Sequence, residues 1–152
     1  MVETSAVAPG ESGVRPPRRS VTTMSEGHPN AIAYRRTADA FRSGDQADLA
    51  SLIASDVLWH VPGAHSMAGE IRGRDQLVAW LRRLRAKGFW LTEHDVFGND
   101  EHVCALSEMG AQRGGVAVIT RVVSIFHYRE GQQSERWFYP DDPVAWEQIF
   151  GE

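Results

Sequence analysis

The stretch DVLWHVPG, residues 56–63, decides how the rest of the chain is interpreted. Apolar, mostly β-forming residues fill it and Pro62-Gly63 ends it, so it predicts a β-strand. Successive side chains of a strand point to opposite faces of the sheet. If Trp59 lines an interior cavity, His60 therefore points the other way, toward solvent or a second subunit.

Two helices are predicted before this strand. The segment HPNAIAYRRTADAFRSGD, residues 28–45, spaces its apolar residues as one helical face, with Asn30 as N-cap and Gly44 as the end. Asp45 is placed to cap a second, short helix over residues 46–54.

After the opening strand the sequence predicts a loop, a helix and then a series of strands. A Gly-rich loop precedes a helix at residues 75–88, whose apolar side chains share one face. Four strands then follow one another as hairpins, and a last short helix begins at Asp142 and Pro143. These four strands are expected at residues 89–97, 103–113, 116–128 and 134–139.

This order of elements indicates an α+β fold, because the helices are segregated from a run of antiparallel strands. We expect a cone-shaped, curved antiparallel sheet that wraps around the long first helix, with two further helices and an interior cavity. Residues 1–27 are rich in Pro, Ser, Thr and Gly and hold no aromatic residue, so they predict a disordered tail. Residues 28–152 are expected to form the single domain.

Composition excludes several classes of protein. The net charge of -4 argues against nucleic-acid binding, because nucleic-acid-binding domains usually carry an excess of basic residues. The lone cysteine, Cys104, cannot form an internal disulfide framework or a thiolate zinc site. No apolar run approaches the roughly 20 residues that cross a bilayer, and no secretory signal is evident, so a cytoplasmic location is expected.

Three segments carry a family resemblance. They are AFRSGDQADLASLIASDVLWHVPG at 40–63, AGEIRGRDQLVAWL at 68–81 and YREGQQSERWFYPDD at 128–142. Together they resemble the SnoaL-like group of polyketide cyclases and ketosteroid-isomerase relatives, within the nuclear transport factor 2-like superfamily. The resemblance implies the cone-shaped fold, a cavity for a small hydrophobic molecule and a homodimer.

The resemblance also suggests catalytic positions. The functional residues of ketosteroid isomerases fall at Thr37, Val61 and near Ser124, where none of the required residue types occurs, so that mechanism is not supported. SnoaL-like cyclases use an aspartate four residues after a tryptophan on the last strand. Asp141 follows Trp137 at that spacing, and the resemblance implies that it acts as acid and base.

Further site residues are predicted from their types and positions. His60 is the second candidate for acid/base work, because an unperturbed imidazole titrates near pH ~6.5. No set of side chains has the spacing of metal ligands, and no phosphate-binding loop or other cofactor motif occurs. The expected substrate-binding residues are Trp59, Trp80, Ser124, Trp137 and Tyr139.

Two functions therefore remain open. The first is a cofactor-independent acid/base enzyme that cyclises, isomerises or ring-opens a small hydrophobic molecule bearing a carbonyl or epoxide. The alternative is a module that binds a small ligand in the same cavity without chemistry. In either case we expect a two-fold homodimer through the sheet, because residues 116–128 present a second apolar face that includes Ile119, Val123 and Ile125.

Overall fold

The computed structural model describes residues 23–151. Residues 1–22 of the predicted tail lie outside the described part of the chain. The remainder of that predicted segment contacts the domain, since the backbone of Ser25 exchanges two hydrogen bonds with Gly98, of 2.8 and 2.9 Å. The described fold thus begins before residue 28.

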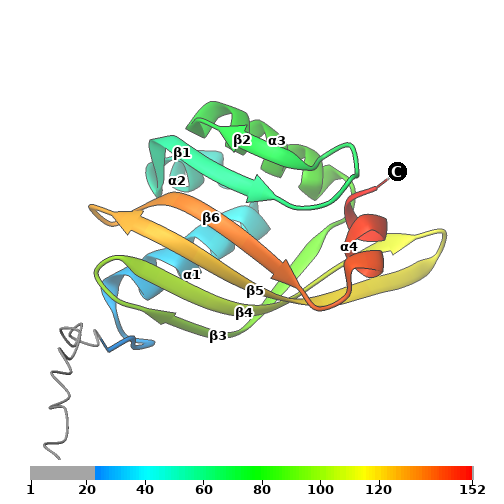
Figure 1. The fold of residues 1–152 in the computed structure, drawn as a ribbon. Coiled ribbons are helices and arrows are strands. Elements are labelled where there is room, and N and C mark those ends of the chain that lie inside the picture. Colours follow the sequence, from blue (N-terminus) through cyan, green and yellow to red (C-terminus); the bar gives the residue numbers. More distant parts are fainter. Residues whose placement is uncertain (1–22, 152) are drawn as a thin grey trace, which may run out of the picture.

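The structure has four helices and six strands in the described residues (Figure 1). The opening strand and the four hairpin strands occur where the sequence predicts them, and the second helix is shorter than predicted. One strand was not predicted, the short β2, because only Ile71 of its four residues is buried and so short a run has no readable period. The elements are α1 (Pro29–Ser43), α2 (Gln46–Ser51), β1 (Ile53–Val61), β2 (Gly69–Arg72), α3 (Arg74–Ala86), β3 (Trp90–Gly98), β4 (His102–Arg113), β5 (Val116–Arg129), β6 (Gln132–Pro140) and α4 (Pro143–Phe150).

Caps at the helix ends fix where α1 and α4 begin. The imidazole Nδ1 of His28, and not Asn30, caps α1 by accepting a hydrogen bond from the Asn30 backbone N–H at 3.1 Å. The side chain of Asn30 instead donates to the carbonyl of Asn99 at 2.8 Å. Asp142 caps α4 as predicted, with its carboxylate accepting from two backbone N–H groups at 3.0 Å.

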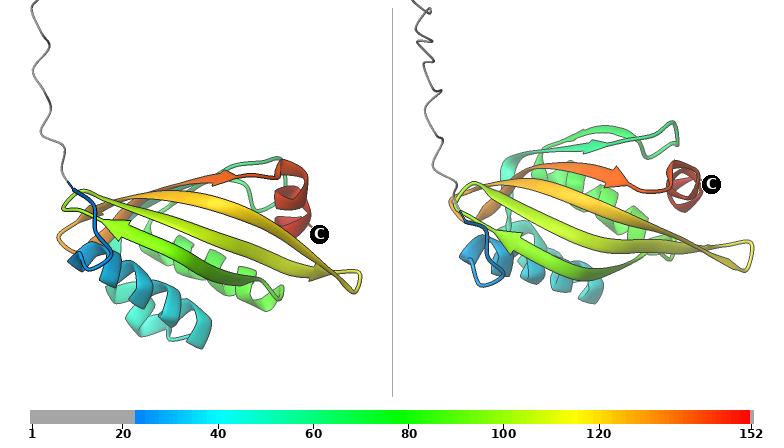
Figure 2. Two further views of the ribbon diagram at one scale, coloured as in Figure 1. Left: turned by 90° about the horizontal axis from the view of Figure 1, so that it is seen from below. Right: turned by 60° about the horizontal axis from the view of Figure 1, so that its bottom comes forward.

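The six strands form one curved, open sheet in the order β2-β1-β6-β5-β4-β3. All neighbours pair antiparallel except β1 and β6, which run parallel. The helices α1, α2 and α3 lie on one side of this sheet, and α4 closes one end (Figure 2). The predicted α+β architecture is confirmed.

The core fills the space between these helices and the concave face of the sheet. Buried residues of β1, β4, β5 and β6 face it alternately, as Val57, Trp59 and Val61 do in β1. Within residues 23–151 no helix covers the opposite, convex face (Figure 2).

None of the helices in residues 23–151 is long and apolar enough to cross a membrane. The cytoplasmic location expected from the sequence stays a prediction.

Candidate functional site

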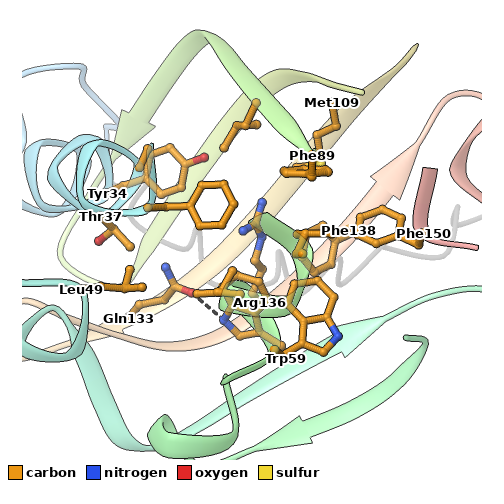
Figure 3. A pocket seen from close by; sticks show the side chains of 16 residues that line it. Tyr34, Thr37, Leu49, Trp59, Phe89, Met109, Gln133, Arg136, Phe138 and Phe150 are labelled. Carbon is orange, nitrogen blue, oxygen red and sulfur yellow. Dashed lines mark hydrogen bonds between the residues drawn. The ribbon is translucent and has the colours of Figure 1, made fainter. Parts of the chain in front are cut away.

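A small cavity lies between α1, α3 and the concave face of the sheet. Its volume is about 40 Å³, which is room for roughly three water molecules. Aromatic and aliphatic side chains make up most of its wall (Figure 3). The lining residues are Tyr34, Thr37, Ala38, Phe41, Leu49, Trp59, Trp80, Leu81, Leu84, Phe89, Leu91, Met109, Gln133, Arg136, Phe138 and Phe150.

An irregularity in β6 brings two polar side chains into this wall. Gln133 and Arg136 are three residues apart, so strict alternation would send them to opposite faces of the sheet. The pairing between β5 and β6 shifts by one residue at Tyr128, which pairs with Gln133 while His127 pairs with Glu135. This bulge leaves one residue unmatched and turns both Gln133 and Arg136 inward.

Arg136 holds a buried charge among aromatic rings. Its guanidinium carbon lies 4.0 Å from the ring centre of Phe138, 4.5 Å from that of Trp59 and 4.6 Å from that of Phe126. One terminal nitrogen, Nη2, donates to the hydroxyl of Ser124 at 2.9 Å. Burial lowers the pKa of Arg136 to about 10, so the side chain is still cationic at neutral pH.

Several donors at the cavity lack partners among residues 23–151. They are Nε of Arg136, Nε2 of Gln133 and the hydroxyl of Tyr34, and their side chains are only 5%, 1% and 2% exposed. Gln133 is oriented by Trp59, whose indole N–H can only donate and lies 2.6 Å from the amide oxygen. The amide nitrogen of Gln133 therefore lacks a hydrogen-bond partner among the described residues, although buried polar groups normally have one.

Of the predicted substrate-binding residues, Trp59 and Trp80 line the cavity. Ser124 is fully buried behind it and contacts the guanidinium of Arg136 rather than the open space. Trp137 and Tyr139 lie on the convex face of the sheet, because they alternate with the inward-facing Arg136 and Phe138.

His60 also lies on the convex face, as the alternation of β1 requires. Its Nε2 is 2.8 Å from a carboxylate oxygen of Glu135, and its ring stacks on Trp137 with the centroids 5.1 Å apart. His127 approaches the other oxygen of Glu135 at 3.3 Å. His60 is thus held in a polar network away from the cavity.

Asp141 lies at the end of β6, outside the cavity wall. Its carboxylate accepts hydrogen bonds from the hydroxyl of Thr120, the backbone N–H of Arg121 and the guanidinium Nε of Arg121, at 2.9, 2.9 and 3.0 Å. These donors, the Thr120 hydroxyl first, lower the pKa of Asp141, whereas a general acid at neutral pH needs a raised one. Its predicted catalytic role stays a prediction, on a residue that contacts Arg121 and not the cavity.

None of the four polar residues that line the cavity beside its tryptophans is among the predicted site residues; they are Tyr34, Thr37, Gln133 and Arg136. Tyr34 is one of the residues that form the apolar face of the first predicted helix, and nothing in that pattern indicates that its hydroxyl reaches a cavity. Strict alternation places Arg136 on the same face as Phe138, but the bulge that turns Gln133 to this face as well has no signature in residue types.

One family of known proteins matches most of the chain. The sequence pattern described as a SnoaL-like domain matches residues 34–136. A protein of Mycobacterium tuberculosis without an assigned function is 34% identical over 120 residues, which span 76% of this chain and 92% of the relative.

Solved structures show the same fold. Bal32a, from a soil-derived mobile gene cassette, is 27% identical with a TM-score of 0.76, and covers 83% of this chain and 99% of its own. TerC, co-crystallised with polyporic acid, is 20% identical with a TM-score of 0.70, over 80% of this chain and 98% of its own. Other matching structures are described as NTF2-like or cystatin-like, which confirms the predicted fold.

The position of Arg136 predicts an unusual effect on stability. Arg136→Met should raise the free energy of unfolding by about 1–3 kcal/mol, because a buried charge is replaced by an apolar side chain of similar length. Below pH about 10, Arg136 is charged in both the folded and the unfolded protein, and burial of the charge lowers the free energy of unfolding. Above pH about 10 the folded protein loses this proton before the unfolded chain does, so the destabilisation decreases as the pH rises. Urea unfolding at neutral pH measures the change.

The control is Arg83→Met, which removes an exposed arginine of α3 and should change stability by less than about 0.5 kcal/mol. A loss of more than about 1 kcal/mol in Arg136→Met, with the control unchanged, would show that the rings and Ser124 compensate the buried charge fully.

Proposed function

The chain belongs to the SnoaL-like domain family, and from this premise we propose that it binds a small, flat hydrophobic molecule in the cavity under its sheet. The observation that carries the proposal is the wall of the cavity. Trp59, Trp80, Phe89, Phe138 and Phe150 surround a space that has only a few polar groups, which is the usual make-up of a small-molecule site.

The size of the cavity limits the ligand. Sites for drug-sized ligands typically enclose about 300–1,000 Å³. The cavity here is about 40 Å³, so a polycyclic molecule would have to displace wall residues. Phe89 and Leu91 are only partly buried and Met109 is flexible, so these side chains can make room for a single ring.

Binding is better supported than acid/base catalysis by the predicted pair. Among the described residues that line the cavity there is no carboxylate and no imidazole. The ionisable groups that do line it are Tyr34, whose pKa is raised by burial, and Arg136, with a pKa of about 10. Neither exchanges a proton readily at neutral pH, as a general acid or base must.

Catalysis in the same cavity is the second candidate. The observation in its favour is the set of buried donors on Arg136, Gln133 and Tyr34. Such donors stabilise the negative charge that develops on an enolate or alkoxide oxygen during isomerisation, cyclisation or ring opening. A neighbour in fold, TerC, has been crystallised with polyporic acid, which is consistent with either candidate.

Binding in the cavity can be followed through two tryptophans. The indole N–H of Trp59 donates to Gln133 in the cavity wall, whereas Trp137 lies on the opposite face of the sheet. Benzamide, a neutral single-ring probe, should therefore shift the indole N–H resonance of Trp59 in a ¹H–¹⁵N NMR titration and leave that of Trp137 in place. Trp59→Phe and Trp137→Phe assign the two signals. A shift confined to Trp137 would contradict the proposal.

We also propose that the protein forms a two-fold homodimer through the convex face of its sheet. Large apolar side chains are exposed there, including Ile119 at 45% and Tyr139 at 54%, together with Leu106 and Val123. Contiguous apolar surface of this kind is normally covered by a partner, and an antiparallel sheet can pair with its own copy about a two-fold axis.

Val123→Glu tests the dimer, because it places a charge at the centre of the convex face. The mass measured by light scattering should fall to that of one chain at micromolar concentration. The matched control is Ile32→Glu, which changes an exposed apolar residue of α1 on the helical side and should leave the mass unchanged. A wild-type protein that is already monomeric would contradict the proposal.

A further inference from the structure

We infer that the ligand of the cavity is a small aromatic carboxylic acid, whose carboxylate binds Arg136 and Gln133. This inference rests on the proposed function and names its substrate class. Its basis is a charged side chain and a neighbouring amide that are buried, belong to residues lining the same cavity and each have one donor without a partner among the described residues.

The charge of Arg136 has no acidic partner in residues 23–151. After the hydroxyls of Tyr34 and Tyr128, the group that acts on this charge is the carboxylate of Glu93 of β3. One oxygen of Glu93 accepts from Arg42 at 2.7 Å, and the other is buried without a hydrogen-bond partner among the described residues. A buried cation is normally paired, because removal from water disfavours the charged form. An anionic ligand would supply the missing partner.

The surroundings of the guanidinium also decide where an anion can bind. The ring centres of Trp59, Phe126 and Phe138 lie within 4.6 Å of its central carbon. One terminal nitrogen, Nη2, donates a hydrogen bond to the hydroxyl of Ser124. The Nε donor stays without a partner among the described residues. Carboxylates bind guanidinium groups through such in-plane N–H donors, often with two bonds in parallel.

Gln133 supplies a second donor to the same space. Its amide oxygen accepts from Trp59, so its Nε2 is the atom without a hydrogen-bond partner among the described residues. The hydroxyl of Tyr128 lies beside this amide; burial raises the pKa of that hydroxyl, and the amide acts to lower it. Figure 3 shows both Gln133 and Arg136 among the residues around the cavity, with the Trp59–Gln133 hydrogen bond drawn. Together the two side chains have one unpartnered donor for each oxygen of a carboxylate.

The remaining walls select the body of the ligand. They are aromatic and aliphatic, and the cavity of about 40 Å³ is smaller than the roughly 150 Å³ of a cavity that binds benzene, so even one ring needs wall side chains to move. A metal cation is disfavoured by the charge of Arg136. Inorganic phosphate would place a strongly hydrated dianion against rings that cannot hydrogen-bond it. The combination of one cation, one amide and apolar walls favours an aromatic acid no larger than benzoate, bound with displacement of wall side chains.

The test compares benzoate with benzamide, which has nearly the same shape and no charge. Isothermal titration calorimetry of the wild-type full chain should give an affinity for benzoate about 10- to 100-fold higher than for benzamide, the usual advantage of a hydrogen bond to a charged group. Arg136→Met should remove this preference. Arg83→Met, an exposed arginine of α3, should keep the wild-type preference.

The outcomes separate the two proposals. Equal affinity of the wild type for benzoate and benzamide overturns the carboxylate inference and leaves the proposed cavity function intact. Absence of binding by both probes, with no shift of the Trp59 resonance, overturns both. Benzoate binding that survives Arg136→Met unchanged also overturns the inference, because the anion would then bind elsewhere.

If Arg136→Met does not fold, Gln133→Leu provides the second variant. It removes the other donor and should lower the affinity for benzoate more than that for benzamide. An equal loss for both probes would contradict a direct contact between Gln133 and the carboxylate. The comparison of the two probes on the wild type decides the inference without either variant.

Discussion

The burial of one positive charge constrains most of this structure. Arg136 lies under the curved sheet with three aromatic rings around its guanidinium and the hydroxyl of Ser124 against one nitrogen. Rings and a single hydroxyl compensate the loss of water only in part, and burial accordingly lowers the pKa of the group. A fold that keeps such a charge without an acidic partner in its described residues is suited to receive that partner from a ligand.

The bulge in β6 gives this charge its position. It turns Gln133 and Arg136 to the same face, and it leaves Trp137 and Tyr139 on the other. Because of this bulge, β6 contributes side chains to two surfaces. Gln133 and Arg136 belong to the concave surface around the cavity, and Trp137 and Tyr139 belong to the convex surface that we propose as the subunit interface. Side chains connect β1 and β6 on both faces of the sheet. On the concave face, Trp59 of β1 donates to the amide oxygen of Gln133 of β6. On the convex face, His60 of β1 contacts Glu135 of β6.

Much of the fold could be predicted from the sequence, because long periodic segments and hairpin turns carry strong signals. The strand 116–128 and the turn at Gly114-Gly115 are of this kind, and so is the alternation that sends Trp59 inward and His60 outward. The site was less predictable. A bulge has no signature in residue types, so strict alternation gave no reason to place Gln133 and Arg136 together. The choice of Asp141 followed a family spacing, which fixes a position along the chain and not the direction of a side chain.

The crystal structure of the protein grown with benzoate tests the central claim most directly. The account predicts benzoate in the cavity, with its ring against Trp59 and Phe138 and its carboxylate oxygens within hydrogen-bond distance of Nε of Arg136 and Nε2 of Gln133. It also predicts that Arg136→Met binds benzoate no more tightly than benzamide. A wild-type structure in which benzoate is absent from the cavity, or lies there with its carboxylate turned away from Arg136, would contradict it.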